Sequence, residues 1–158
     1  MKSTIARDTM LFLEDLRKNN NREWFNRNKE RFTEANEDFI DVVQSLIDHV
    51  SKFDKSVAGV NAKHSVFRIY RDTRFSGDKS PYKTHFGASL SRKGPNCGLA
   101  GYYIHLQPGE SFIAGGVHMM EQNQLKAIRE EISAKGKEFL KIIDNKGFRK
   151  NFTLAEQN

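Results

Sequence analysis

The sequence predicts an α+β fold in which helices pack against an antiparallel sheet. Two observations predict it. Apolar residues recur at helical spacing near both ends of the chain, and between them they alternate as in strands, with glycine and proline marking the turns. We expect a sheet of about four strands packed against a long helix in the N-terminal half and against C-terminal helices. A chain of 158 residues is long enough to bury a core, so we expect one domain, residues 1–158.

The N-terminal part reads as two helices. Asp8 or Thr9 is suited to cap the first helix, and the asparagines at 19–21 are suited to end it and to cap the second. The second helix is predicted over residues 22–50. Its buried face is predicted from apolar residues three, four or seven positions apart: Phe25, Phe32, Ala35, Phe39, Val42, Leu46 and Val50.

The middle of the chain reads as two hairpins followed by helices. Strands are predicted over residues 66–70, 84–91, 101–107 and 111–117, with turn residues between the members of each pair. In the third strand, alternation places Tyr103, His105 and Gln107 on one face and apolar residues on the other. Helical spacing returns from residue 121, and a shorter helix is predicted over residues 137–144.

Positive charge is concentrated in the first hairpin. Residues 63–93 contain eight Lys and Arg against two Asp, a net charge of +6, which equals the charge of the whole chain. A localised excess of this kind attracts anions. Guanidinium groups bind phosphate and carboxylate in pairs of hydrogen bonds, and a tyrosine can stack on a base or donate a hydrogen bond. The candidate anion-binding residues are Arg68, Arg71, Arg74, Lys79, Tyr82 and Lys83.

Three functions fit this pattern. The first is a binding protein for an anionic small molecule or for nucleic acid. The second is an enzyme acting on an anionic substrate, with His85 or His105 as acid or base and the arginines as a clamp. The third is purely structural: the arginines and aspartates form a buried ionic network that fixes the hairpin on the helices, with Arg71 against Asp78 or a helix carboxylate. In this interpretation Tyr82 lies at the edge of the core.

Other site classes are not expected. Flanking arginines are expected to occupy Asp72 and Asp78, and the histidines lack compact ligand spacing, so we predict no metal and no cofactor. The stretch at residues 77–80 lacks the glycines of a Walker A loop. Cys97 is the only cysteine, which excludes an internal disulfide and favours the cytoplasm, and it would be nucleophilic only beside a base. No stretch predicts a membrane span or a signal peptide.

Three groups of residues resemble a known family. The central group is Arg68-Ile69-Tyr70-Arg71-Asp72, Arg74-Phe75-Ser76, Asp78-Lys79 and Pro81-Tyr82-Lys83. The others are Phe12-Leu13, Asn19-Asn20, Trp24-Phe25 and Lys29, and Tyr103, His105, Gly109-Glu110-Ser111 and Gly115-Gly116. Together they resemble the bacterial and fungal family catalogued as domain of unknown function 2461. The resemblance implies a chain that lacks the family's C-terminal part. The family has no established activity, so the resemblance supports the location of a site and implies no chemistry.

Overall fold

The computed structural model describes residues 4–92, 94, 98–118 and 120–155. The chain forms two compact units, residues 1–118 and residues 119–158. The first contains α1 (Arg7–Lys18), α2 (Arg22–Arg27), α3 (Lys29–Val50), a 3₁₀ turn η1 (Lys55–Val57), α4 (Ala62–Ser65), β1 (Phe86–Leu90), β2 (Gly101–Leu106) and β3 (Phe112–Gly116). The second contains α5 (Gln122–Ala134), α6 (Gly136–Ile143) and α7 (Lys146–Asn151). The α+β prediction is confirmed, but the described residues form three strands where about four were expected.

The start of α1 differs from the prediction. The helix is capped at Ala6, so the predicted cap at Asp8 or Thr9 is wrong. Thr9 is buried, and its hydroxyl donates to Asp38 Oδ2 of α3 at 2.5 Å. The same oxygen accepts the Ala6 backbone N–H at 2.9 Å. A carboxylate from another helix therefore satisfies an amide at this helix terminus, a tertiary contact that local sequence does not reveal.

The helix predicted over residues 22–50 is interrupted at Asn28. The Asn28 side chain donates to Trp24 O at 2.9 Å, and α3 starts at the following residue. Asparagine competes in this way for backbone hydrogen bonds, which explains the break. The capping role predicted for the asparagines is confirmed at Asn21, whose side chain accepts the Trp24 backbone N–H at 2.9 Å.

The buried face of α3 is shifted slightly around the helix from the predicted face. Ala35, Phe39, Val43 and Ile47 are buried at intervals of four, whereas Phe32, Leu46 and Val50 lie partly buried at its edge. Phe39 stacks on Phe86 of β1 with ring centroids 5.5 Å apart. This contact between helix and sheet belongs to one continuous core.

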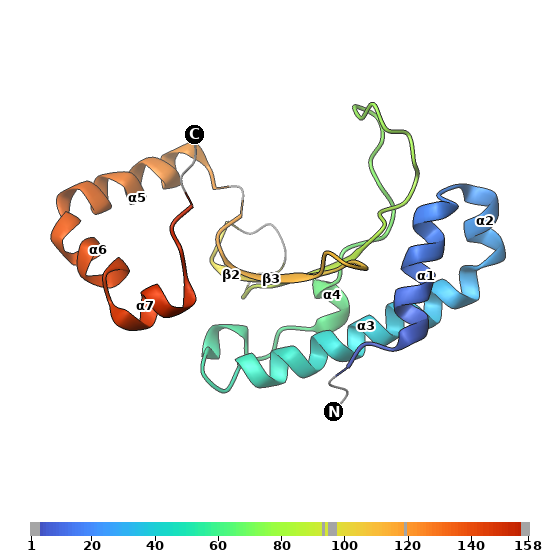
Figure 1. The fold of residues 1–158 in the computed structure, drawn as a ribbon, viewed down its shortest axis with the longest axis horizontal. Coiled ribbons are helices and arrows are strands. Elements are labelled where there is room, and N and C mark those ends of the chain that lie inside the picture. Colours follow the sequence, from blue (N-terminus) through green and yellow to red (C-terminus); the bar gives the residue numbers. More distant parts are fainter. Residues whose placement is uncertain (1–3, 93, 95–97, 119, 156–158) are drawn as a thin grey trace. The chain divides into compact units, whose positions relative to one another are not determined.

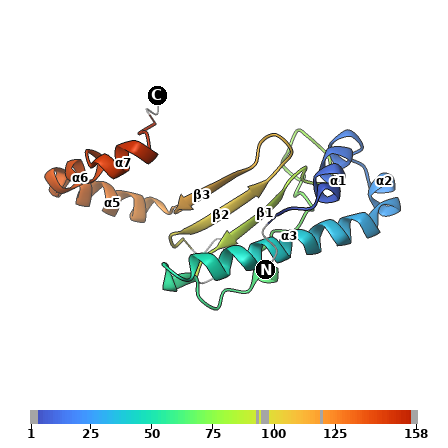
Figure 2. The same cartoon turned by 60° about the horizontal axis from the view of Figure 1, so that its bottom comes forward.

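The sheet is antiparallel, in the order β1-β2-β3, and its register pairs Phe86 with Leu106 and Gly87 with His105. Its helix face is buried, with Phe86, Ala88, Leu90, Ile104 and Leu106 in the core. Figure 2 shows the three strands beside α3. Because side chains alternate along a strand, Gly87, Ser89, Tyr103 and His105 lie on the other face, which we call the second face.

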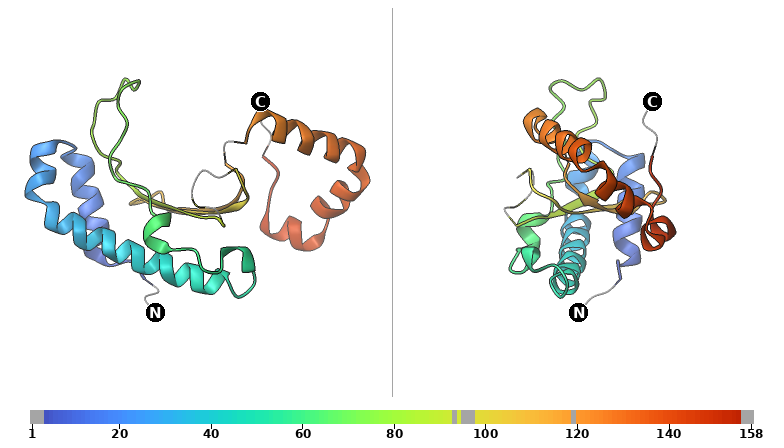
Figure 3. Two further views of the ribbon diagram at one scale, coloured as in Figure 1. Left: turned by 180° about the vertical axis from the view of Figure 1, so that it is seen from behind. Right: turned by 90° about the vertical axis from the view of Figure 1, so that its left-hand side faces the viewer.

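Residues 66–86, which we call the basic hairpin, rise on the side of the sheet opposite α3 (Figures 1 and 3). The predicted strand at residues 66–70 is wrong as a continuous strand, because its ladder is reduced to isolated bridges, Val66 with Ala88 and Tyr70 with Tyr82. Pro81 accepts the Arg71 N–H at 2.9 Å, but a proline has no N–H to return. This missing donor keeps the ladder short.

Asn20 fastens the basic hairpin to the helices. Its side-chain amide donates to Tyr82 O at 2.9 Å and accepts the Tyr82 N–H at 3.1 Å, as a neighbouring strand would. The Tyr82 ring is buried and stacks on Phe25 with centroids 4.0 Å apart. Backbone and side chain of Tyr82 are therefore both fixed by the helical layer.

The second unit is helical and has no buried residue in its described helices. The helix predicted from residue 121 is confirmed as α5, with a capping box between Glu121 and Gln124. The helix predicted over residues 137–144 is confirmed as α6, and α7 was not predicted. In the part of the chain that the structure describes, no helix combines the length and apolar character needed to cross a membrane.

We expect Gly101→Ala to destabilise the first unit. A Cβ at Gly101 would lie 2.5 Å from Leu90 O and 3.0 Å from Ser91 Cβ, so the backbone of β1 would have to move. The expected loss in the free energy of unfolding is about 2 kcal/mol, as for other overpacked sites. The measurement is denaturant unfolding.

Gly115→Ala is the matched control in the same sheet, since a Cβ there would meet Tyr102 Cδ1 at an ordinary 3.9 Å. It should change the free energy of unfolding by less than about 0.5 kcal/mol. Equal effects of the two substitutions would contradict the close approach at Gly101.

Candidate functional site

A group of polar and aromatic side chains gathers on the second face. We call it the second-face cluster: Phe67, Lys83, His85, Tyr103, His105 and Phe112. His85 comes directly before the buried Phe86, so alternation turns it away from the core. His105 pairs with Gly87 of β1 on one side and with Phe112 of β3 on the other, so His105 lies in the middle strand of the sheet.

The aromatic rings form a row across the sheet. His85 and His105 have centroids 4.2 Å apart, and His105 and Phe112 stack at 4.8 Å with 14° between their planes. Gly87 makes room next to this row. A Cβ there would lie 3.0 Å from Tyr103 Oη and 3.3 Å from Phe67 Cδ2, so any other residue would push these side chains away.

A chain of hydrogen bonds runs through His105. Tyr103 Oη lies 2.9 Å from His105 Nδ1, and His105 Nε2 lies 3.1 Å from Gln107 Oε1. Gln107 Nε2 donates to Glu110 Oε2 at 2.5 Å. The turn between β2 and β3 brings these last two together, because Pro108-Gly109 occupies its centre and Gly109 has a φ of +79°, as in a type II turn.

Burial sets the charge states in the second-face cluster. It lowers the pKa of His85 from 6.5 to about 4, with smaller effects from His105 and Lys83. Burial also lowers the pKa of Lys83, helped by Arg68, and it raises the pKa of Tyr103. His85 is therefore neutral at pH 7, and the Lys83 ammonium is held in surroundings that disfavour its charge.

The tip of the basic hairpin is cross-linked by its own charges. Arg71 pairs with Asp78 and also donates to the Ser80 hydroxyl, which confirms the predicted contact between Arg71 and Asp78. Arg74 pairs with Asp72 at 2.7 Å. Hydrogen bonds from Ser80, and then from Arg71, lower the pKa of Asp78 to about 2. Both acids of the hairpin are thus occupied by arginines, as expected.

The predicted site residues separate into three places. Lys83, His85 and His105 lie together in the second-face cluster, and Arg68 is close enough to affect Lys83 electrostatically. The second place is the hairpin tip, where Arg71 and Arg74 lie with Lys79, whose ammonium donates to Thr73 O at 3.0 Å. The third is the core: Tyr82 is only 4% exposed, which confirms the structural alternative for its ring. Cys97 lies outside the described residues.

Five residues of the site were not among the predicted site residues: Phe67, Tyr103, Gln107, Glu110 and Phe112. Alternation had placed Tyr103 and Gln107 on one face with His105, and the Pro-Gly pair had indicated the turn. The sequence pattern did not predict that Phe67 packs against Tyr103, because the two residues come from different hairpins. Their ring centroids lie 6.3 Å apart.

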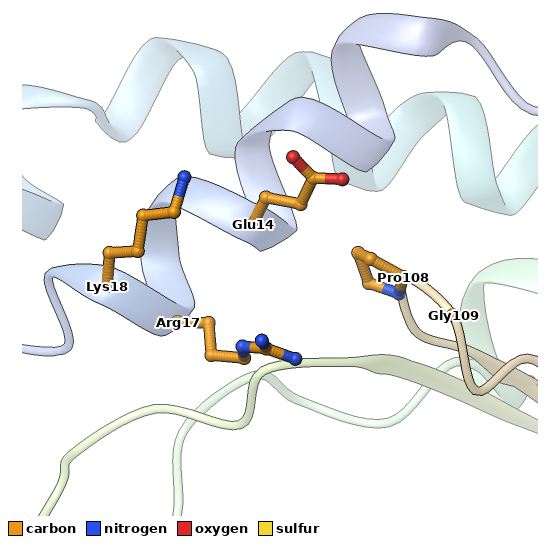
Figure 4. A pocket seen from close by; sticks show the side chains of 5 residues that line it. All are labelled: Glu14, Arg17, Lys18, Pro108 and Gly109. Atoms are coloured by element: carbon orange, nitrogen blue, oxygen red, sulfur yellow. The ribbon is translucent and has the colours of Figure 1, made fainter.

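A separate hollow of about 350 Å³ lies between α1 and the β2–β3 turn. It is lined by Glu14, Arg17, Lys18, Pro108 and Gly109. In Figure 4, Arg17 extends toward the turn, whereas Lys18 points away from it. Its charges are of mixed sign, so it selects no single class of ligand as clearly as the second-face cluster. Among residues 4–92, 94, 98–118 and 120–155, no three His, Cys, Asp or Glu side chains gather as a metal site requires.

The arginines and aspartates of the hairpin tip, and Lys83, Tyr103 and His105 of the second-face cluster, are among the residues that carry the family resemblance. The model of the family described as "Conserved hypothetical protein (DUF2461)" matches residues 8–158. The chain belongs to this family. No curated protein and no solved structure matches it. The DUF2461 match thus confirms the resemblance and assigns no activity, so a function has to be argued from the site itself.

We expect His85 to make the protein less stable in mild acid. Its folded pKa of about 4 lies below the usual 6.5, so between these values the unfolded chain binds more protons. The free energy of unfolding then falls as the pH falls from about 6.5 to about 4, by roughly 1 to 2 kcal/mol once solvent at the half-buried ring is allowed for.

The measurement is urea unfolding at a series of pH values. At each pH, the free energy of unfolding of the His85→Gln variant is subtracted from that of the natural chain, which removes the contribution of the carboxylates. The exposed His64 is the control, and His64→Gln should leave the pH dependence unchanged. If the two variants behave alike, His85 is not held neutral by burial.

Proposed function

We propose that the protein binds an anionic ligand, bearing phosphate or carboxylate, where the basic hairpin meets the second face. The proposal rests on the position of Lys83. Its ammonium lies 5.6 Å from the centroid of the Phe67 ring and donates to Arg68 O at 2.9 Å. Among the described residues, no carboxylate pairs with it. A partly buried cation without a counter-ion is stabilised when an anion binds beside it.

Arg68 is the natural second contact. It is exposed, and none of the ion pairs between described residues includes it. Its charge makes only the smallest of the contributions that lower the pKa of Asp72. Arg71 and Arg74, in contrast, are already paired with acids of the hairpin. We therefore assign Lys83 and Arg68 to the ligand, and Arg71 and Arg74 to the shape of the hairpin tip. Lys79 would add to the local field that attracts the anion.

A small molecule is favoured over nucleic acid as the ligand. Nucleic-acid surfaces hold several phosphates with many unpaired cations, whereas the acids of this hairpin neutralise two of its arginines. The aromatic row beside Lys83 offers a compact surface for one organic anion. The location that accompanies this proposal is the cytoplasm, as the single cysteine suggests.

The test is calorimetric titration with pyrophosphate and with citrate at low salt. Lys83→Met keeps the apolar stem on Phe67 but removes the charge, and we expect it to weaken binding by about tenfold, the effect of one charged hydrogen bond. Lys79→Met is the matched control, because it removes the same charge at the hairpin tip, outside the second-face cluster. It should weaken binding by less than about threefold.

Absence of binding to either anion, or equal losses in the two variants, would contradict an anion site at Lys83. A salt series with single-stranded oligonucleotide tests the other ligand. If oligonucleotide binds more tightly than pyrophosphate and its affinity falls steeply with salt, the nucleic-acid alternative replaces the small-molecule proposal.

A further inference from the structure

The hydroxyl groups of two neighbouring tyrosines on β2 have different acceptors. Tyr102 points to the helix face of the sheet and donates to Asp54 Oδ2 at 3.0 Å. Tyr103 points to the second face, and its hydroxyl lies 2.9 Å from His105 Nδ1. An aspartate hydrogen-bonded in this way stabilises the protonated phenol, and this contact raises the pKa of Tyr102. An imidazole can instead take the proton and return it near neutral pH.

The hydrogen-bond chain fixes which nitrogen of His105 carries its proton. Gln107 donates to Glu110 through Nε2, so its Oε1 is left to accept. Oε1 faces His105 Nε2 at 3.1 Å, which places the imidazole proton on that nitrogen. His105 Nδ1 is then the acceptor for the Tyr103 hydroxyl. Each group donates a hydrogen bond to the next, from Tyr103 to Glu110. Gln107 and Glu110 thereby orient the His105 ring, as a carboxylate orients a catalytic histidine.

Gln107 and Glu110 favour transfer of the proton to His105, whereas burial raises the pKa of Tyr103 and so opposes its loss from the phenol. When His105 accepts a proton at Nδ1, Gln107 remains bonded to the opposite N–H and Glu110 supplies negative charge behind it. The stacked His85 is neutral, because burial lowers its pKa to about 4, so it does not add a second positive charge next to the imidazolium. Lys83, on the same face, is the cation to which we assign the ligand.

We propose that Tyr103 and His105 form an acid–base pair that exchanges a proton with the anion bound at Lys83, with Gln107 and Glu110 as positioning residues. This inference rests on the proposed function for its ligand. In the forward step, the Tyr103 oxygen takes a proton from a hydroxyl or activated C–H group of the ligand, while the Tyr103 proton moves to His105 Nδ1. The ligand keeps the electron pair, and His105 becomes imidazolium. The reverse step returns both protons.

The reactivity of Tyr103 tests the pair without knowledge of the natural ligand. Phenylmethanesulfonyl fluoride reacts with activated hydroxyls: the tyrosine oxygen bonds to sulfur, fluoride leaves, and the hydroxyl proton passes to the base. We expect Tyr103 to be sulfonylated at least about tenfold faster than Tyr102 or Tyr70, read by peptide mass spectrometry. Tyr102 has a carboxylate partner, and Tyr70 is 50% exposed, so accessibility alone would favour Tyr70.

Variants identify the base. His105→Gln should slow the labelling of Tyr103 by about tenfold or more and remove the rise of its rate with pH. Asp54→Asn is the matched control: it changes the partner of Tyr102 and should leave Tyr103 unaffected. Gln107→Leu should slow the labelling of Tyr103 by only a few-fold. It should also move the pH dependence of the labelling rate to lower pH, because the imidazolium loses its acceptor. A purely structural role would not produce this shift. Unchanged labelling of Tyr70 in each variant shows that the fold is intact.

Three outcomes overturn the inference. If Tyr103 reacts no faster than Tyr70, or if His105→Gln leaves its rate unchanged, the acid–base pair does not exist. If Tyr103 reacts rapidly but saturating pyrophosphate does not slow it in the natural chain, the pair does not act on an anion at Lys83. Because labelling requires no bound anion, failure of the proposed function is seen separately, as absence of pyrophosphate binding by calorimetry.

Discussion

Coverage of the sheet by helices on one face is the constraint on which the rest of the first unit depends. Phe86, Ala88, Ile104 and Leu106 face the helices and are buried. Each large apolar side chain buried in this way contributes about 1.5–3 kcal/mol, enough to fix the register of β1 and β2. A slip by one residue would bury His105 and expose Leu106. The packing of the core therefore also determines that His105 lies on the second face.

The same constraint reaches the basic hairpin through Tyr82. Its ring stacks on Phe25, and its backbone is held by the Asn20 side chain. Lys83 and His85 lie one and three residues after Tyr82, so the helical layer sets the position from which they extend onto the second face. The family signature that includes Pro81-Tyr82-Lys83 thus joins a core residue to a site residue.

The ion pairs of the hairpin tip have a different role. Both aspartates of the Asp72–Arg74 and Asp78–Arg71 pairs are at least 45% exposed, whereas the Arg71 side chain is 25% exposed. Exposed pairs contribute about 0–1 kcal/mol each. Both partners of each pair belong to the hairpin itself, so these pairs do not hold the hairpin on the helices. The structural alternative of a buried ionic network is therefore weaker than a role in shaping the tip. The hairpin is held mainly by Asn20 and Tyr82.

The sequence by itself determined the α+β class, the span of β2 and the start of α5 to within one residue, and the face shared by Tyr103, His105 and Gln107. These features follow from local periodicity and turn residues. Only the tertiary structure decided that Asp38 caps α1, that Asn28 interrupts the long helix, and that the bridge between Tyr70 and Tyr82 stays isolated. It also decided that Lys83 and His105 both lie near His85, while Arg71 and Arg74 stay at the tip. Spacing along the chain fixes which face a side chain takes. Which charges meet depends on how the hairpins pack on the helices.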